Sequence, residues 1–228
     1  MASNPRRQLE EWLKTIEVNG EVVFDVGGAQ LPVKDRIRSF KTDRYFILDK
    51  KNPHELSDRA LEYLDKGGFD IEDPELFLDR AGDNEYLGRF VQFVNSHMAY
   101  QISTNALKDA DTMTSVFCLE VMEYVLDPVV AIKNLRNLCS PNSNLYISFG
   151  FLYPHHNPVG MDALRYTEWG AVELLRQNGF EVEEITPRKL TPEGDALLQE
   201  FYRAEGMRAS KEAANHHASG WLIKAIAV

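Results

Sequence analysis

An acidic residue followed by two glycines is the first place in this sequence where residue types and spacing suit ligand binding. Asp25 lies near the end of an apolar run and precedes Gly27 and Gly28, and Asp49 ends a second apolar run 24 residues further on. An acid at the end of a second strand can accept hydrogen bonds from both ribose hydroxyls, and glycine lets the backbone pass close to a ligand. The spacing therefore favours a nucleoside site. A plain turn with a solvated or capping acid is the alternative.

The loop after Gly28 argues against a dinucleotide. The Gly-x-Gly-x-x-Gly fingerprint is absent, because residues 29–32 read Ala-Gln-Leu-Pro. A pyrophosphate needs exposed amides at a helix start with no side chains in the way. The side chains at 29–32 make such a set of amides unexpected in this loop. We therefore expect a nucleoside without phosphates, and a nicotinamide or flavin enzyme is disfavoured.

Two adjacent histidines are the candidates for proton transfer. His155 and His156 follow a predicted strand end, beside a proline. Histidine suits general-base work, and because adjacent side chains rarely face the same way, we expect at most one to be catalytic. Asp162 and Arg165 are three residues apart, so they can meet on one helical turn. The alternatives are an ordinary loop pair of histidines and a structural ion pair that orders the loop.

Alternating strand-like and helix-like segments indicate how these residues are positioned. Strands are expected at 21–26, 45–49, 90–94, 112–119, 145–149, 180–185 and 221–228. Helices are expected at 8–17, from Asp127-Pro128 onward, at 168–177 and over 192–217. This alternation predicts an α/β fold, a doubly wound, Rossmann-like, mostly parallel sheet with helices on both faces. Ligands bind such sheets at the carboxyl ends of the strands, where Asp25, Asp49, Glu120 and the 150–156 loop should converge.

The tryptophans are expected in the core: Trp12, Trp169 and Trp221.

These segments, in this order, resemble class I S-adenosylmethionine-dependent methyltransferases. Residues 25–29 look like that family's first motif, Asp/Glu-x-Gly-x-Gly-x-Gly, and Asp49 looks like its ribose-binding acid. Residues 111–128 are similar to the fourth-strand phrase that ends Glu-Val-Leu-Glu-His-Val-x-Asp-Pro. Residues 151–167 are similar to a sub-group phrase, Pro-x-His-x-x-Pro-x-Asp-x-x-Arg-Tyr-Thr, and residues 177–180 fit the Gly-Phe that enters the sixth strand.

The resemblance covers most of residues 10–185 and the last strand, and it implies a cofactor and a reaction. It implies a seven-stranded sheet with an antiparallel last strand, S-adenosylmethionine as cofactor, and methyl transfer to an oxygen or nitrogen atom of a small molecule or glycan. His155 or His156 is then the general base for the accepting group. The implied cofactor-binding residues are Asp25, Gly27, Gly28, Asp49, Asn95, Leu119 and Glu120. An acidic rim suits the sulfonium cation, and the methionine amine can pair with an acid such as Asp25.

Departures from the family pattern leave a second interpretation open. Ala29 and Leu31 replace the second and third glycines of the first motif, and Tyr124 stands where the family often has histidine. No acid is identifiable on the third strand, where Asn95 is the substitute. These changes motivate an alternative to the enzyme, a degenerate methyltransferase fold that acts as a non-catalytic binding or regulatory module.

A metal site is a further alternative to these interpretations. Glu120 and Glu123 with His155 or His156 have the residue types for an oxygen and nitrogen ligand set, as in small-RNA 2′-O-methyltransferases. Tyr124 breaks that pattern of two glutamates and two histidines. We therefore expect no metal.

Length, composition and charge bound the remaining choices. The chain of 228 residues suits a single domain, 1–228, in which 50–88 and 188–217 are insertions or lid segments. The net charge of −10 disfavours nucleic acid as a partner, so a nucleic-acid methyltransferase is a weaker hypothesis. Two cysteines and no apolar run of about 18 residues predict a cytoplasmic protein with no membrane span. A homodimer is left open.

Overall fold

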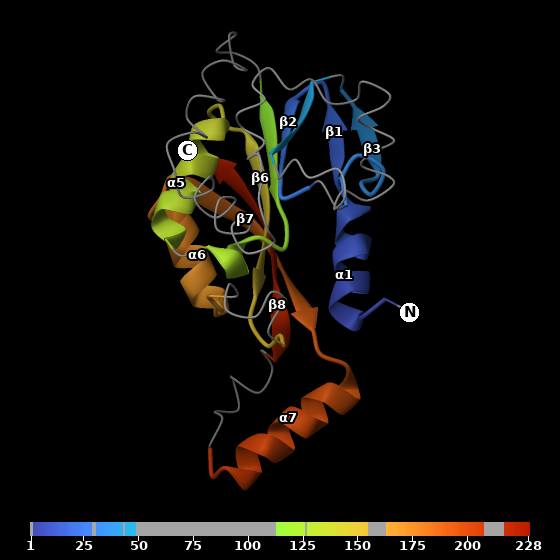
Figure 1. Ribbon diagram of the computed structural model, residues 1–228, viewed down its shortest axis with the longest axis vertical. Coiled ribbons are helices and arrows are strands. Elements are labelled where there is room, and N and C mark those ends of the chain that lie inside the picture. The colour runs from blue at the N-terminus through green and yellow to red at the C-terminus, as the bar shows by residue number, and fades with distance from the viewer. Residues whose placement is uncertain are drawn as a thin grey trace, which may run out of the picture.

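A mostly parallel sheet forms the centre of the computed structural model, which describes residues 2–28, 31–42, 44–48, 113–125, 127–154, 163–207 and 217–228 (Figure 1). Within these residues six strands pair in the order β4 (Tyr45–Leu48), β2 (Val22–Val26), β5 (Thr114–Cys118), β6 (Asn144–Gly150), β8 (Ala218–Ala227) and β7 (Phe180–Lys189). The last strand, β8, is antiparallel to both of its neighbours, and the other pairs are parallel. The predicted sheet type and the antiparallel last strand are confirmed. The strand expected at 90–94 lies outside the described residues.

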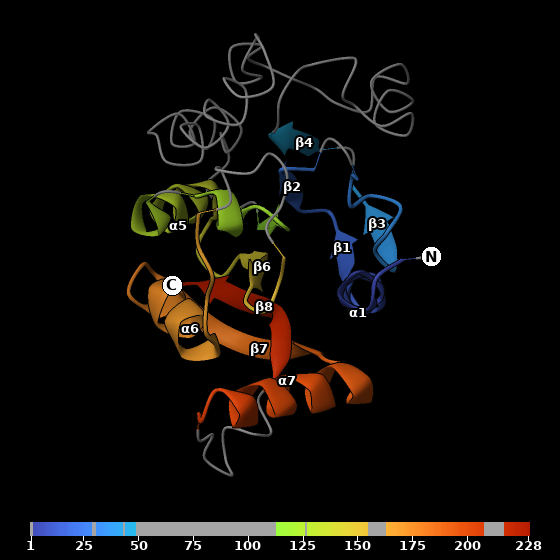
Figure 2. The same ribbon diagram turned by 60° about the horizontal axis from the view of Figure 1, so that its bottom comes forward.

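Helices cover both faces of this sheet (Figure 2). Helix α1 (Asn4–Leu13) packs on one face, while α5 (Pro128–Leu138) and α6 (Glu168–Arg176) pack on the other. Alternate residues of β2 point to opposite faces, so Phe24 lies among the side chains of the α5 side and Val23 among those of the α1 side. Burial on both faces explains why the central strands read as continuous apolar runs.

Local side-chain hydrogen bonds begin the helices where the sequence predicts. The carboxylate of Asp127 accepts a hydrogen bond from the amide of Val130 at 3.1 Å, and a proline follows it in the first turn of α5. The hydroxyl of Thr167 accepts from the amide of Gly170 at 3.1 Å at the start of α6. Such caps stabilise a helix by about 1 kcal/mol each, and they need only residues that are near in sequence.

Three sequence expectations are wrong in detail. The helix expected at 8–17 begins at Asn4, because a proline occupies its first turn, and it ends at Leu13. Residues after it form the short strand β1 (Glu17–Asn19), which pairs with β3 (Ser39–Lys41). Helix α7 (Pro192–Ala204) ends before residues 205–207, which are not helical, and residues 208–216 lie outside the described residues. The third correction is Trp169, which is 71% exposed, because it lies in the first turn of α6 and the buried face of that helix begins at Ala171.

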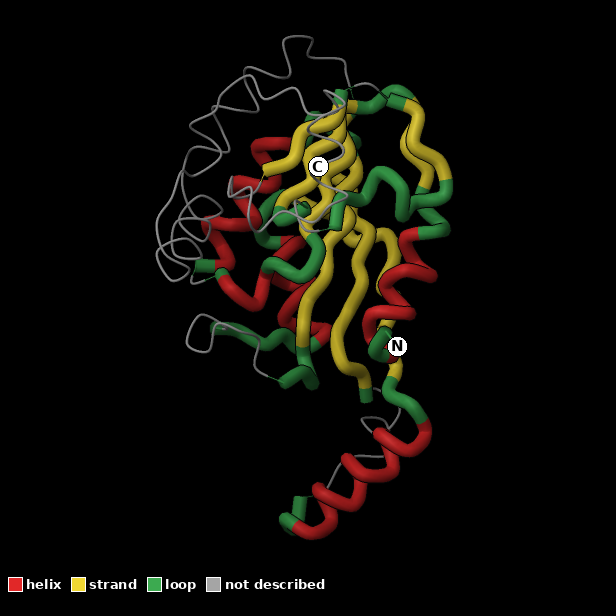
Figure 3. The backbone as a smooth tube through the Cα atoms, turned by 45° about the vertical axis from the view of Figure 1, so that its right-hand side comes forward, coloured by secondary structure: helices red, strands yellow, loops and turns green. Residues whose placement is uncertain are grey.

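Helix α7 stands away from the rest of the molecule (Figures 1 and 3). It follows β7, and none of its own residues is buried. The imidazole Nδ1 of His217, just before β8, lies 2.6 Å from the carboxylate of Asp195 on this helix. Among the helices of the described residues, none is long and apolar enough to cross a membrane.

Two glycines that face each other in the sheet test how tightly β6 and β8 pack. Gly220 of β8 is opposite Gly150 of β6. A Cβ at Gly220 would lie closer than 3.0 Å to the carbonyl oxygen of Phe149, whereas a Cβ at Gly150 would meet nothing within 4 Å. We expect Gly220→Ala to lower the free energy of unfolding by about 2 kcal/mol through overpacking, measured by urea denaturation. The matched variant Gly150→Ala should stay within about 0.5 kcal/mol of wild type. Equal losses in both variants would contradict this packing argument.

Candidate functional site

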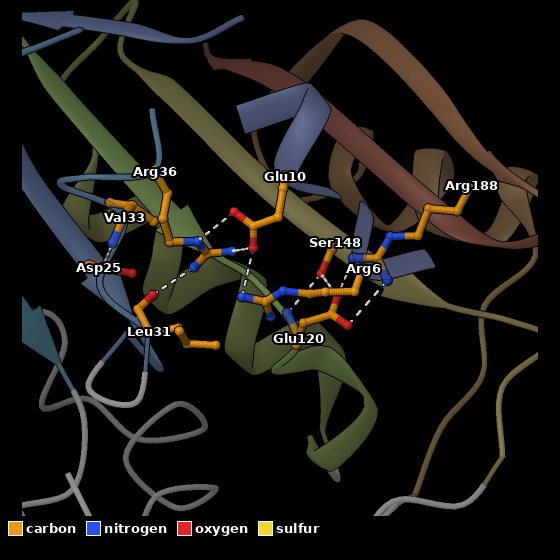
Figure 4. Close-up of polar contacts among 9 residues, drawn as sticks. All are labelled: Arg6, Glu10, Asp25, Leu31, Val33, Arg36, Glu120, Ser148 and Arg188. Atoms are coloured by element: carbon orange, nitrogen blue, oxygen red, sulfur yellow. Dashed lines mark hydrogen bonds and ion pairs between the residues drawn. The ribbon is translucent and has the colours of Figure 1, made fainter. Parts of the chain in front are cut away.

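The carboxyl ends of the parallel strands bring four polar side chains to one edge of the sheet (Figure 4). Asp25 lies near the end of β2, Glu120 just after β5, Ser148 near the end of β6 and Arg188 near the end of β7. This is the edge where ligands bind on sheets of this type. The predicted convergence of Asp25 and Glu120 at this edge is therefore seen in the structure.

Asp25 lies beneath the glycine loop and is only 2% exposed. One of its carboxylate oxygens, Oδ2, accepts hydrogen bonds from the amide of Val33 at 2.9 Å and from the hydroxyl of Tyr45 at 2.5 Å. Burial, and then the charge of Asp25, raise the pKa of Tyr45 well above its usual value, so this hydroxyl keeps its proton and donates. A buried carboxylate needs such donors. The buried Asp25 carboxylate therefore fixes the conformation of the loop after β2 by binding the amide of Val33.

Gly28 is in contact with that carboxylate. A Cβ at this position would lie closer than 3.0 Å to three atoms of the Asp25 carboxyl group, so no other residue fits here without a shift. Gly27 adopts a φ of +80°, a conformation that glycine tolerates and most residues do not. The two predicted glycines thus keep the end of β2 free of side chains, with Gly27 partly exposed and Gly28 buried against the Asp25 carboxylate.

Arg36 connects the loop to helix α1. Its Nη1 donates to the carbonyl oxygen of Leu31 at 2.6 Å, and its Nε and Nη2 donate to the two carboxylate oxygens of Glu10 at 3.2 and 3.0 Å. Arg6, one turn earlier on α1, pairs with the same carboxylate at 2.8 Å. Burial alone would raise the pKa of Glu10, but the hydrogen bond and charge of Arg36, with those of Arg6, lower it. Glu10 is therefore ionised and bound by two arginines.

Glu120 has a strained backbone and a fully engaged side chain. Its φ of +58° is unusual for a residue other than glycine and costs about 1 kcal/mol or more. Its amide donates to the hydroxyl of Ser148 at 2.7 Å, and that hydroxyl donates to the Glu120 carboxylate at 2.8 Å. Arg188, a buried residue, donates to Oε2 at 3.1 Å and also to Oε1. These contacts hold the strained conformation in place.

The charge state of Glu120 follows from these partners. Burial raises its pKa, but the charge and hydrogen bonds of Arg188 and the hydrogen bond from Ser148 outweigh burial, so the pKa lies below its usual value. A carboxylate in this state is a weak base. Among the described residues, no group of three or more His, Cys, Asp or Glu side chains gathers to hold a metal ion.

Arg165 anchors the start of the segment that carries the histidines. Its Nη1 donates to the carbonyl oxygen of Leu164 at 2.9 Å, and its Nη2 reaches the carbonyl oxygens of Tyr153 and Pro154, each at 3.4 Å. His155 is the next residue in the chain. Other predicted site residues lie outside the described residues: Asp49, Asn95, His155, His156 and Asp162. Their roles, and the pairing of Asp162 with Arg165, stay predictions, while Leu119 packs against the core on the α1 side.

Several polar residues at this edge were missed by sequence reasoning: Arg6, Glu10, Arg36, Tyr45, Ser148 and Arg188. Only the spacing of Arg6 and Glu10, four residues apart on a helix, gives a signal in the sequence. The pair of Arg36 and Glu10 spans 26 residues, and the pair of Arg188 and Glu120 spans 68. No local pattern marks such distant pairs.

Comparisons with solved structures identify the fold. No family model and no curated relative matches this chain. A protein assigned as a methyltransferase in a complex with the Haloferax volcanii Trm112 methyltransferase activator is 17% identical, with a TM-score of 0.55 over 98% of this chain and 89% of that chain. A 1,6-didemethyltoxoflavin-N1-methyltransferase from Burkholderia thailandensis, solved with its substrate and S-adenosylhomocysteine, is 14% identical, with a TM-score of 0.52 over 98% and 78%. An S-adenosylmethionine-dependent methyltransferase from Aquifex aeolicus is 15% identical, with a TM-score of 0.50 over 98% and 89%.

These likenesses, together with the strand order and the antiparallel last strand, give the chain the class I S-adenosylmethionine-dependent methyltransferase fold. The fold that the motifs imply is thereby confirmed. At this level of identity the comparison concerns the fold, and activity is a separate question.

The ion pair of Glu120 and Arg188 should contribute to the free energy of unfolding. Glu120→Gln should lower the free energy of unfolding by about 3 kcal/mol at pH 7, because it leaves the buried Arg188 without an ionised partner. In wild type the contribution of ionised Glu120 is present above its unfolded pKa of about 4.3, and it is lost as pH falls toward the lower folded value. The difference between wild type and the variant should therefore shrink in acid, as followed by urea denaturation between about pH 7 and pH 3.

A double variant separates the charge pair from simple packing. Glu120→Gln combined with Arg188→Met removes both charges, and it should be more stable than the sum of the two single losses predicts. Strictly additive losses, or a difference between wild type and Glu120→Gln that is constant with pH, would show that the pair does not act as described.

Proposed function

We propose that this protein is an S-adenosylmethionine-dependent methyltransferase that moves a methyl group to an oxygen or nitrogen atom of a small molecule or glycan. The observation that carries the proposal is the glycine turn at the carboxyl end of β2 within a class I methyltransferase fold. In this turn Gly27 is partly exposed and Gly28 is buried against Asp25. One structure of this fold, the Burkholderia N1-methyltransferase, contains S-adenosylhomocysteine and a small-molecule substrate, which supports the cofactor and the acceptor class.

The residues of the site fit this cofactor. It has one ribose and no phosphate, which agrees with a loop that lacks the dinucleotide fingerprint. Backbone amides near Gly27 and Gly28 would bind its carboxylate, and Asp49 would accept hydrogen bonds from its ribose hydroxyls. When bound, the cofactor supplies a methyl group on a positively charged sulfur. Asn95, Leu119 and the backbone at Glu120 complete the proposed cofactor contacts.

The chain's own part in the reaction is positioning and the removal of a proton. Glu120 is engaged by Arg188 and Ser148, so its carboxylate is unsuited to act as the base. We assign that role to His155 or His156, on the segment that Arg165 anchors at Tyr153 and Pro154. A histidine there would accept the proton of an OH or NH acceptor as it attacks the methyl carbon. The cytoplasmic location and the homodimer stay predictions.

Cofactor binding is the first test. Isothermal titration calorimetry with S-adenosylhomocysteine should give saturable binding to wild type, and Asp49→Ala should weaken it at least tenfold, or about 1.4 kcal/mol, by removing the ribose acceptor. Asp195→Ala, on the distant helix α7, is the matched control and should bind like wild type. If S-adenosylhomocysteine does not bind to folded wild type, the proposal is wrong, and a non-catalytic binding or regulatory module is favoured.

The histidine assignment has its own test. His155→Ala and His156→Ala are made separately, and S-adenosylhomocysteine formation is followed from S-adenosylmethionine with a panel of phenols, amines and sugars. One variant should lose about 10²–10⁴-fold in turnover, with its affinity for S-adenosylhomocysteine unchanged, because only the general base is removed. If both variants turn over as fast as wild type, neither histidine takes part in the mechanism.

A further inference from the structure

Charged side chains of alternating sign cross the carboxyl edge of the sheet: Arg36, Glu10, Arg6, Glu120 and Arg188 (Figure 4). They come from the loop after β2, from α1, from the end of β5 and from β7. Among these described side chains three are arginines and two are glutamates. These five side chains therefore carry one more positive than negative charge, and the buried carboxylate of Asp25 at the same edge is held separately by the amide of Val33 and the hydroxyl of Tyr45.

Among the described residues, Arg6 has the fewest partner atoms of the three arginines. Arg36 and Arg188 are each bound to both oxygens of one glutamate, Arg36 to Glu10 and Arg188 to Glu120. Arg6 has one ion pair, at 2.8 Å, with the Glu10 carboxylate that Arg36 already binds. Its side chain is 28% exposed, against 2% for Arg188, so a ligand can approach it.

Electrostatics around Arg6 agree with an incompletely compensated charge. Burial first, and then the charge of Arg36, lower the pKa of Arg6, while Glu10 and Glu120 offset only part of that change. A further negative charge at this place would stabilise the protonated guanidinium. Arg6 also lies between Glu10 and Glu120 in the close-up, at the centre of the line of charges (Figure 4).

A second observation comes from Arg188. Its Nε atom is buried and has no hydrogen-bond partner among the described residues. Buried donors are nearly always paired, so such an atom calls for an explanation. The edge thus holds an unsatisfied donor on Arg188 and an arginine, Arg6, that shares its one carboxylate partner with Arg36. Planar guanidinium groups suit carboxylate oxygens particularly well.

We propose that Arg6, supported by Arg188, binds a carboxylate at this edge of the sheet. The proposal rests on the proposed function, because there the same edge holds the cofactor and the acceptor. The carboxylate comes from one of two sources. It is either the amino-acid part of the cofactor, which Arg6 would then bind together with the amides near Gly27 and Gly28, or an acidic acceptor molecule. In the second case the acceptor is a small molecule or glycan that carries an acidic group.

A thermal-shift experiment tests the carboxylate site directly. The melting temperatures of wild type and Arg6→Gln are measured with acetate, succinate and benzoate, against sodium chloride of equal ionic strength, with and without saturating S-adenosylhomocysteine. The carboxylates should raise the melting temperature of wild type and not that of Arg6→Gln. Arg38→Gln, which removes an arginine that is 67% exposed and paired with Glu17 at 3.2 Å, is the matched control and should respond like wild type.

Calorimetry identifies the source of the carboxylate. If it belongs to the cofactor, Arg6→Gln binds S-adenosylhomocysteine about tenfold more weakly, while 5′-methylthioadenosine, which lacks the amino-acid part, binds as it does to wild type. If it belongs to the acceptor, both nucleosides bind unchanged, and the carboxylate shift persists in wild type saturated with S-adenosylhomocysteine. Arg6→Lys, which keeps the charge without the planar fork, should retain part of the effect.

One result overturns the proposal. If Arg6→Gln matches wild type both in the carboxylate shifts and in the binding of the two nucleosides, Arg6 only ties α1 to the sheet. Failure of the proposed function is distinguishable, because wild type would then bind neither nucleoside. The carboxylate panel without cofactor still tests Arg6 in that case, and the melting temperatures without ligand show whether each variant is folded.

Discussion

The carboxylate of Asp25 is the contact on which the shape of the site depends. It is buried at the end of β2, between strands that pair on both sides, so its position is set by the sheet. The amide of Val33 and the hydroxyl of Tyr45 supply the hydrogen bonds that a buried charge requires. Gly28 packs directly against it. One side chain therefore connects the second strand of the sheet, the glycine loop and the segment that follows the loop.

Helix α1 extends this arrangement to the start of the chain. Its apolar side places Leu9, Trp12 and Leu13 in the core on one face of the sheet. Its polar side brings Arg6 and Glu10 to the carboxyl edge, where Arg36 connects them to the loop after β2. The same helix thus covers the sheet and contributes charges to the site. Because the helix begins at Asn4, before its apolar stripe, Arg6 and Glu10 lie one turn apart on it.

Glu120 illustrates how a tertiary partner changes the chemistry of a motif residue. By itself a carboxylate at the end of β5 has the chemistry of a base, a metal ligand or a partner for an amine. The buried Arg188 and the hydroxyl of Ser148 occupy it and keep it ionised. A fixed ion pair suits a reaction in which most of the enzyme's work is to hold two molecules in line. Proton removal is then left to another group, for which the histidine segment anchored by Arg165 is our proposal.

The α/β class, the order of the elements and the positions of several helix starts can be predicted from the sequence. These depend on periodicity and on contacts between near residues, such as the capping bonds of Asp127 and Thr167, which span three residues. The exposure of Trp169 and the partners of the charged side chains depend instead on contacts between distant parts of the chain. Asp25 and Tyr45 are 20 residues apart, and Glu120 and Arg188 are 68 apart. Such pairs form because the sheet brings strand ends together, and no local pattern in the chain records that proximity.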